Sequence, residues 1–347
     1  MTREVETRFR IMRNGVIFGE LYPAANSAPR LQMSDSAAIK TSLSGDFVEP
    51  EEIDWLSDEI QPVLIIDGVE NPLGVFLPAT VTPTETETSK IVKLTAYDRC
   101  WRVKDTYAES SVYFASGTNY ITAIESLLTA AGIVLVVKTP TTATFPEARE
   151  DWQVGASYLD IVNELLEEIS YNPLWFNSQG AAVLEPSSVP TAEHIEHTLD
   201  STDVRSLLLP EISRETDIYS APNVFLCICS SADKIAPLTA TAENTNPQSP
   251  LSIMRRGRRI MKVVRVNNIA NQTALNAYAE KLRNDSMMSG ETIKVTTALL
   301  PGYGVADVTA IRYGDLSAIC VEHEWEMELR VGGSMKHTLE RVVANLG

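Results

Sequence analysis

A strict alternation of apolar and acidic residues is the clearest pattern in the chain, and it lies near the C-terminal end. From Ile319 to Val331, every odd position except His323 is apolar. The even positions include four glutamates, here called the glutamate row: Glu322, Glu324, Glu326 and Glu328. Because successive side chains of a strand point to opposite faces, the pattern predicts a long strand with one dry face and one wet, acidic face.

The residues after this strand predict a hairpin. Gly332-Gly333 turns the chain into a second strand, Ser334–Val343. Charges roughly 7 Å apart along the glutamate row repel one another, and folding alone gives no reason to concentrate them. A long hairpin with a dry side and an acidic side is typical of a barrel wall or a tube lining.

The first hundred residues also have the pattern of β-structure. Asn14-Gly15 separates two strand-like segments, Val5–Met12 and Val16–Leu21, which is the strongest short hairpin signal. Asp67-Gly68 predicts a second hairpin with a longer connection, whose return strand is Gly74–Leu77. Several short strands with regular turn signals predict a small barrel.

The middle of the chain predicts two amphipathic helices. Thr118–Ala131 places its apolar residues on one side and stops at Gly132. Ser157 begins the second helix in a capping box with Asp160, so its hydroxyl should accept hydrogen bonds from first-turn amides. Leu174–Leu184 then forms a hairpin, and the whole segment is predicted to be an α+β module.

A β pattern returns after residue 212, with one helical interruption. Asn223–Ser230 and Ile260–Val266 are predicted strands on either side of a polar loop, Ala232–Pro250. Gln272–Met288 is a predicted helix, and further strands lead to the closing hairpin.

These elements predict an α+β fold, mainly β, with two β-barrel domains and an inserted α+β module. The expected boundaries are 1–104 for the first barrel, 105–211 for the α+β module, 212–231 with 289–347 for the second barrel, and 232–288 for a loop-strand-helix insertion that packs with the α+β module.

Composition and charge exclude several classes of protein. A length of 347 residues suits two or three domains, and an apolar content of 44% disfavours disorder. The net charge of −17 argues against a protein that grips nucleic acid or an anionic membrane, because both need a basic surface. The N-terminus lacks an apolar stretch and no window reaches 18 apolar residues, so neither a secretory signal nor a membrane helix is expected.

The histidines and cysteines give no catalytic or metal site. Glu193–His197 holds two histidines three positions apart, but it lacks the His-Glu-x-x-His zinc pattern and is predicted to be an extended surface segment. His323 is expected in the core, and His337 is the other candidate for acid–base work. The four cysteines are expected to be buried free thiols, as in a protein made in a reducing cytoplasm. We therefore expect no catalytic residue, no cofactor and no metal.

One basic cluster stands out in this acidic chain: Arg255, Arg256, Arg258 and Arg259. It is either a docking contact for an acidic protein neighbour or a solvated loop that enters a strand. Nucleic acid is disfavoured, because no aromatic residues interleave with the arginines to stack bases.

The order of these elements resembles the baseplate hub family of contractile phage tails and phage-tail-like particles, in particular the prophage type. Four passages carry the resemblance: Val63–Pro78, Leu94–Arg99, Asp160–Leu184 and Leu300–Val308. Together they span most of the chain.

The resemblance implies a homotrimer in which each subunit supplies two tail-tube-like barrels, so that a six-fold tail tube is matched to a three-fold spike. The implied partners are the central spike protein, the tail tube or tube-initiator protein, baseplate wedge proteins and the tape measure protein, with no membrane and no specific nucleic-acid binding. The implied location is the tail baseplate of a virion or phage-tail-like particle, after synthesis in the bacterial cytoplasm. No catalytic site is carried over.

Two other functions are left open by the residues. A tail-associated cell-wall hydrolase would use abundant carboxylates and the Glu193–His197 segment, and a receptor-binding component would use aromatic residues such as Trp55 or Trp152. If the chain is a hub, the glutamate row either lines the channel, where it repels a passing polyanion, or faces a basic partner.

Overall fold

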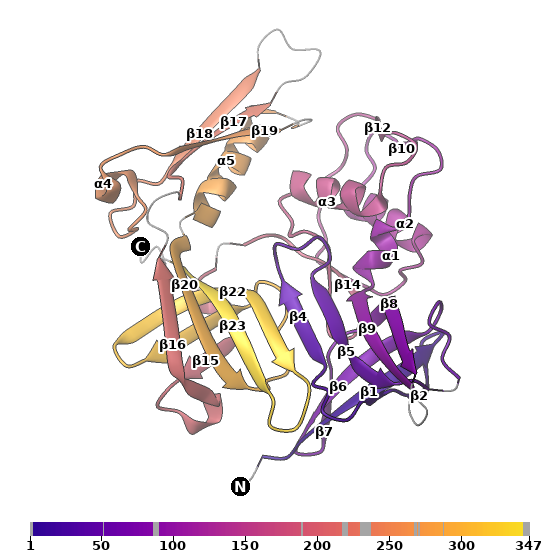
Figure 1. Ribbon diagram of the computed structural model, residues 1–347. Coiled ribbons are helices and arrows are strands. Elements are labelled where there is room, and N and C mark those ends of the chain that lie inside the picture. The colour runs from indigo at the N-terminus through magenta and orange to yellow at the C-terminus, as the bar shows by residue number, and fades with distance from the viewer. Residues whose placement is uncertain are drawn as a thin grey trace. The chain divides into compact units, whose positions relative to one another are not determined.

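The computed structural model describes residues 3–50, 52–85, 90–188, 190–216, 221–229, 237–266, 269, 271–286 and 288–342. Strands dominate and short helices lie between them, so the predicted α+β, mainly β, fold class is confirmed (Figure 1). Residues 230–236, which include the start of the predicted polar loop, and Val343, the predicted end of the last strand, lie outside the described residues. Among the helices that are described, none combines the length and the apolar character needed to cross a membrane.

The chain divides into two compact units, each built from three stretches of sequence. The first comprises Met1–Ser187, Thr297–Val305 and His323–Lys336, and the second comprises Ser188–Thr296, Ala306–Glu322 and His337–Gly347. Three of the described strands supply residues to both units, namely β20 (Met288–Ala298), β22 (Leu316–Glu328) and β23 (Ser334–Val342).

The first unit contains a large, mostly antiparallel sheet. Its strands from the N-terminal part of the chain are β1 (Val5–Arg13), β2 (Val16–Glu20), β3 (Tyr22–Pro23), β4 (Arg30–Ser34), β5 (Thr41–Val48), β6 (Glu59–Ile66), β7 (Val69–Pro72), β8 (Phe76–Glu85) and β9 (Lys90–Asp98). The hydrogen-bonded order is β22-β4-β5-β9-β8-β6-β1-β2, with β3 paired to β5 and β7 to β6. Figure 1 shows β4, β5, β9 and β8 side by side.

Turn chemistry explains the first two hairpins. Asn14 and Gly15 both have positive φ (52° and 78°), as a two-residue hairpin turn requires, and β1 pairs with β2 as predicted. Asp67 and Gly68 form a similar turn (φ 49° and 80°). There the predicted return strand was wrong, because the chain pairs immediately through β7 and only later reaches β8.

The α+β module of the first unit follows β9. Its helices are α1 (Cys100–Lys104), α2 (Tyr120–Ala130) and α3 (Tyr158–Glu168), and its strands are β10 (Val112–Phe114), β11 (Val136–Lys138), β12 (Arg149–Trp152), β13 (Trp175–Phe176) and β14 (Ala182–Leu184). The predicted helices and the β13–β14 hairpin are present.

The N-terminal caps of the two longer helices differ. Asn119 caps α2, since its Oδ1 accepts hydrogen bonds from the amides of Ile121 and Thr122. The predicted capping box at Ser157 is wrong. The hydroxyl of Ser157 instead donates to the carbonyl of Lys104, 2.9 Å away, and ties α3 to the end of α1.

Two apolar clusters form the core of this unit. One lies between the strands and includes Phe9, Phe47, Phe76, Trp325 and Met327. The other lies in the α+β module and is built from α2, α3 and the strands beside them. Burial of these apolar side chains is the main driving force for folding.

Arg99 joins the sheet to the α+β module within the first unit. Its guanidinium donates to both carboxylate oxygens of Glu59 (Nε to Oε1 3.0 Å, Nη2 to Oε2 2.6 Å) and to the carbonyl of Gly180 (3.0 Å). Gly180 lies in the β13–β14 turn, and the amide of Gly74 donates to the carbonyl of Ser178 in the same turn. The turn therefore packs closely on the residues that precede β8.

The second unit contains a smaller sheet. It is built from β15 (His197–Asp200), β16 (Leu208–Thr216), β20 (Met288–Ala298), β21 (Val308–Tyr313) and the second-unit parts of β22 and β23. The order is β16-β20-β23-β22, with β21 paired to β22 and β15 paired in parallel to β21. Short 3₁₀ helices span Ala192–His194 and Val204–Ser206.

A three-stranded sheet with two helices is the other part of the second unit. It consists of β18 (Leu238–Glu243), β17 (Val224–Cys229) and β19 (Met261–Val266), in that order, with α4 (Ile253–Arg256) before β19 and α5 (Gln272–Ser286) after it. The prediction of a polar loop from Ala232 to Pro250 was wrong at β18, whose small apolar residues Ala240 and Ala242 pack under α5. The threonines that alternate with these alanines give the segment a polar composition, which is why the sequence predicted a loop.

Replacement of Gly180 by alanine should destabilise the first unit. The new Cβ would lie 2.7 Å from Cγ2 of Val75, and the backbone φ of +72° is strained for any residue with a side chain. We expect a loss of about 2–4 kcal/mol in urea unfolding. Gly117→Ala is the matched control, because it shares a positive φ but meets no atom within 4 Å, and it should cost only about 1–2 kcal/mol. Equal costs would show that the Val75 contact is not tight.

Candidate interaction surfaces

The alternation of β22 changes phase along the strand. In its second-unit part, the even positions Ala318, Cys320 and Glu322 are buried together with Val321, whereas in its first-unit part the buried positions are odd (Trp325 and Met327). The prediction of a single dry face from Ile319 to Val331 was therefore wrong. Each half of the strand buries the face that packs against the core of its own unit.

The change of phase buries one member of the glutamate row. Glu322 has no exposed side-chain surface, so the expectation that it meets water is wrong. Its Oε2 lies 2.9 Å from Nδ1 of His337, which is equally buried on β23. Burial, with a smaller contribution from the charge of His197, lowers the pKa of His337 to about 3, so its imidazole is neutral at pH 7.

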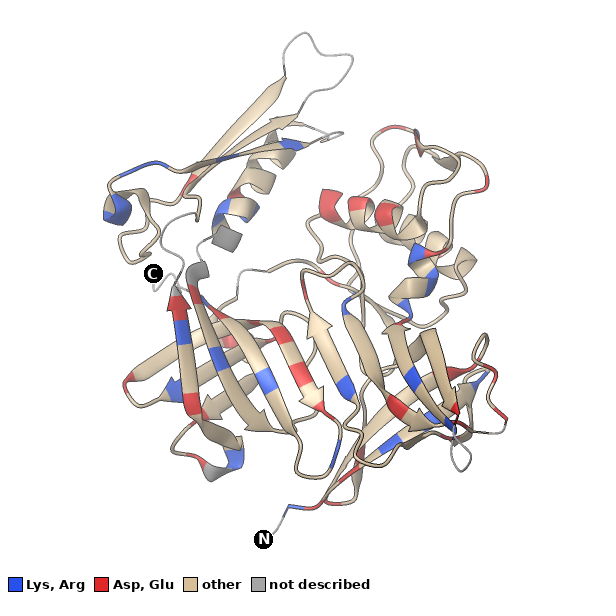
Figure 2. Cartoon of the chain, viewed as in Figure 1, with Lys and Arg blue, Asp and Glu red and all other residues tan. Residues whose placement is uncertain are grey.

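The remaining glutamates of the row lie in the first unit and have polar neighbours. Figure 2 shows acidic residues as red bands along β22. Glu326 accepts hydrogen bonds from Gln32 (2.6 Å) and Lys336 (3.3 Å), and Arg30 lies within 4.0 Å of both Glu326 and Glu328. Glu324 is exposed. Partial burial opposes the ionisation of Glu326, but the two hydrogen bonds together with the charges of Lys336 and Arg30 outweigh it and hold its pKa below the ordinary value.

The Glu193–His197 segment is divided between a short helix and the start of a strand. Glu193 and His194 lie in an exposed 3₁₀ helix, where an extended segment was predicted, and Nδ1 of His194 is 3.2 Å from the Thr191 hydroxyl. His197 begins β15, and its Nε2 is 3.0 Å from Oδ2 of Asp307. Within the described ranges, no group of three or more His, Cys, Asp or Glu side chains is arranged to hold a metal ion.

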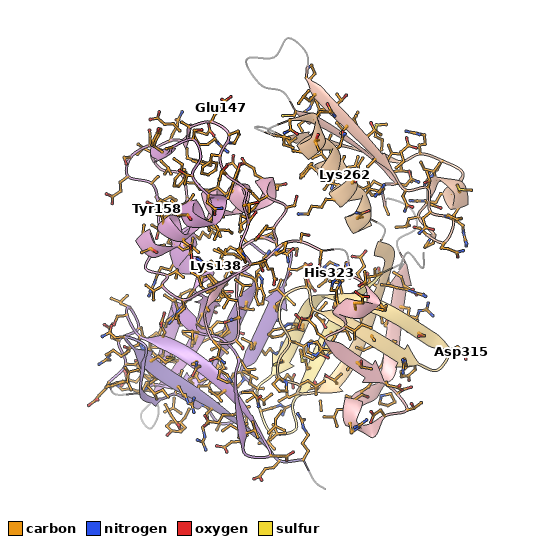
Figure 3. The ribbon with its side chains drawn as sticks, turned by 180° about the vertical axis from the view of Figure 1, so that it is seen from behind. Lys138, Glu147, Tyr158, Lys262, Asp315 and His323 are labelled. Atoms are coloured by element: carbon orange, nitrogen blue, oxygen red, sulfur yellow. The ribbon has the colours of Figure 1, made fainter. Side chains whose placement is uncertain are left out.

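His323 is not a core residue, contrary to the prediction. Its side chain, labelled in Figure 3, is 29% exposed. Its Nδ1 is hydrogen-bonded to Oδ2 of Asp35. Trp152 is buried and Trp55 is partly buried against the core, which leaves neither as an open aromatic platform. All four cysteines are buried free thiols, as expected.

The arginine loop, residues 252–260, has a defined shape. The hydroxyl of Ser252 caps α4 by accepting from the amide of Arg255, and Gly257 ends this helix in the left-handed conformation. Arg256 donates to the carbonyl of Ala221, and Arg259 pairs with Glu243 at 2.6 Å. Arg255 and Arg258 are exposed. Figure 2 shows the basic residues of α4 in blue.

A buried asparagine holds this loop in place, and sequence reasoning missed it. Asn223 has no exposed surface, donates to the carbonyls of Leu251 and Arg258, and accepts from the amide of Ile260 at 2.7 Å. Such a side chain replaces backbone partners on both ends of the loop. The only sequence signal is a polar residue at the start of an apolar strand. A solvated loop without a fixed conformation would not be held by such a buried side chain.

The fold is shared with phage tail proteins. The sequence matches no protein-family model and no curated protein. Among solved structures, a tail protein from Neisseria meningitidis matches with a TM-score of 0.67 and 15% identity, over 96% of each chain. The 43 kDa tail protein of prophage MuSo2 from Shewanella oneidensis matches with a TM-score of 0.67 and 10% identity, over 96% of this chain and 98% of its own.

A type VI secretion component shares the fold more distantly. The c3393 protein of E. coli, which is structurally similar to the T4 bacteriophage tail proteins gp27 and gp5, has a TM-score of 0.51 and 9% identity, over 100% of this chain and 76% of its own. The resemblance that the sequence indicated is thus confirmed as a likeness of fold, and the β parts are of the tail-tube-like kind.

Substitution along the glutamate row should separate its buried member from the rest. Glu322→Ala removes a buried hydrogen-bonded partner and should cost about 2–4 kcal/mol in unfolding free energy. The combined change of Glu324, Glu326 and Glu328 to glutamine should cost about 1–2 kcal/mol at most, because solvated ion pairs contribute little. Urea titrations of the two variants test this. A triple variant less stable than Glu322→Ala would contradict it.

The buried state of His337 predicts a dependence of stability on pH. The folded imidazole has a pKa of about 3, whereas the unfolded one takes up a proton near 6.5. The stabilisation is therefore complete above pH 6.5 and is lost as the pH falls toward 3, by up to about 1.4 kcal/mol per pH unit. His337→Gln should remove this part of the slope in urea titrations between pH 7.5 and 4.5. His194→Gln, at an exposed histidine, is the control, and equal slopes in all three proteins would contradict the prediction.

Proposed function

We propose that this chain is a structural baseplate hub subunit of a phage or phage-tail-like contractile particle. It forms a trimeric ring that adapts the six-fold tail tube to the three-fold spike and encloses the central channel. The observation that carries the proposal is the match to two tail proteins over 96% of this chain and nearly all of theirs.

The partners follow from the place of such a ring in the tail. They are the central spike protein, the tail tube or tube-initiator protein and baseplate wedge proteins, with the tape measure protein in the channel. The arginine loop supports a protein contact, because Asn223 holds exposed arginines at a fixed position in an otherwise acidic chain. The location is the tail baseplate, after synthesis in the bacterial cytoplasm.

The three glutamates of the row that keep exposed surface fit a lining of the channel. Glu324, Glu326 and Glu328 keep negative charge on one face of β22, where it would prevent a passing polyanion from sticking. Glu322 is excluded from this surface by its burial against His337.

The role is structural, without enzymatic activity. A cell-wall hydrolase built on the Glu193–His197 segment is not favoured, since His194 is bonded locally to Thr191 and His197 to Asp307. A histidine that acts as general acid must contact the substrate, whereas these two contact neighbouring side chains.

Assembly measurements test the proposal. Multi-angle light scattering at tens of micromolar should give three times the 38.2 kDa chain mass, and the trimer should join the purified spike protein of the same particle. A chain that stays monomeric both alone and with the spike would overturn the hub assignment. Clearing of peptidoglycan that vanishes in Glu193→Gln would overturn the structural role.

A further inference from the structure

An exposed apolar surface with an acidic rim lies at one end of the first unit. It consists of Val16, Ile17 and Phe18 on β2 and of Leu56 in the loop before β6. Leu56 is 97% exposed, and the three β2 residues are each more than 40% exposed. Soluble proteins seldom leave such a group of large apolar side chains in water without a partner.

Arg13 makes this surface rigid. Its guanidinium donates to both carboxylate oxygens of the buried Asp58 (2.7 Å each) and to the carbonyl of Glu52 (3.0 Å), and it lies 4.1 Å from the centre of the Phe18 ring. Asp54 closes the turn that presents Leu56, since its carboxylate accepts from the amide of Leu56 and the hydroxyl of Ser57. The loop and the hairpin are therefore one pre-organised body.

The rim of this surface is acidic, and its backbone is a sheet edge. Glu52 and Asp54 are exposed, and Glu49 is partly exposed. In the described part of the chain β2 pairs only with β1, so it ends the sheet. An edge strand with exposed apolar side chains is a template for a strand from another chain.

The second unit carries a surface of opposite charge with the same construction. The strand β19 ends its own sheet and pairs with β17 alone among the described strands. Met261 and Val263 are each 50% exposed on the face opposite α5, and Met254 is exposed on α4. Its basic residues are Arg255 and Arg258 in the arginine loop, with Lys262 and Arg265 on β19 itself (Lys262 is labelled in Figure 3).

We propose that the acidic edge around β2 and Leu56 in one copy of this chain binds the basic edge formed by the arginine loop and β19 in a second copy. Charge complementarity and exposed apolar side chains on both edges support a second copy as the occupant. Because the two surfaces differ, the contact is heterologous, which is the type that generates rings. The proposal rests on the self-assembly in the proposed function and names the surfaces that carry it.

Paired charge reversals test the contact. One variant carries Glu49→Lys and Glu52→Lys, and another carries Arg255→Glu and Arg258→Glu. Each should raise the dissociation constant of the oligomer at least tenfold in sedimentation equilibrium, and the chain that combines all four changes should recover assembly. Glu109→Lys with Glu147→Lys is the control for the first variant. It makes the same change of net charge as Glu49→Lys with Glu52→Lys, but at exposed sites elsewhere in the first unit.

Leu56→Asp tests the apolar part separately. The side chain is almost fully exposed, so the monomer fold and its circular dichroism should be unchanged while assembly weakens at least tenfold.

The outcomes separate this inference from the proposed function. Reversals that leave the oligomer intact, or a combined variant that does not recover, would overturn the contact and leave the hub assignment standing. Loss of binding to the purified spike by the arginine variant, with normal self-assembly, would assign the basic edge to the spike instead. A wild-type chain that never self-associates would overturn both.

Discussion

Two neighbouring charged residues, Asp98 and Arg99, fix the geometry of the first unit, because Asp98 is buried and Arg99 mostly buried where β9 ends. Asp98 is buried and accepts three hydrogen bonds, from the amide and hydroxyl of Thr41 and from the amide of Cys100. Its burial still raises its pKa above the ordinary value, although these bonds act against the rise. Arg99 binds Glu59 and the carbonyl of Gly180. A charge without partners in such a place costs several kcal/mol, so β5, β6, α1 and the β13–β14 turn must all be correctly placed for the unit to fold.

This constraint suits the structural role proposed for the chain. The contact between the β13–β14 turn and the residues before β8 is too close for a side chain at Gly180, which makes the joint between sheet and module stiff. In that proposed role, binding to partners depends on surfaces that the fold holds in fixed directions. Arg13 with Asp58 and Asn223 with the arginine loop repeat the same device, in which a buried polar group shapes an exposed edge. Specificity for a partner comes from such pre-organised edges, since ordering them on binding would cost affinity.

Local chemistry could be predicted from the sequence, whereas long-range partners could not. The hairpin at Asn14-Gly15 and the helices α2 and α3 depend on turn residues and periodicity that lie next to each other in the chain. The capping role of Ser157 failed because a carbonyl 53 residues away, that of Lys104, offers its hydroxyl an alternative. Likewise β18 was missed because α5, which covers it, lies more than thirty residues downstream. The arginines were visible as a cluster, but the asparagine that positions them was not.

The glutamate row shows how one repeated pattern can hide two environments. In sequence its four members are equivalent, and their spacing implies one continuous acidic face. Between Glu322 and Trp325, however, the buried face of β22 changes, at the same place where the strand passes from the second unit to the first. Glu322 thereby becomes a core residue with a neutral histidine as its partner, while Glu324, Glu326 and Glu328 stay on the polar side. Charge repulsion along the row is reduced by this arrangement, because one carboxylate is withdrawn and two of the others have cations from β4 and β23 beside them.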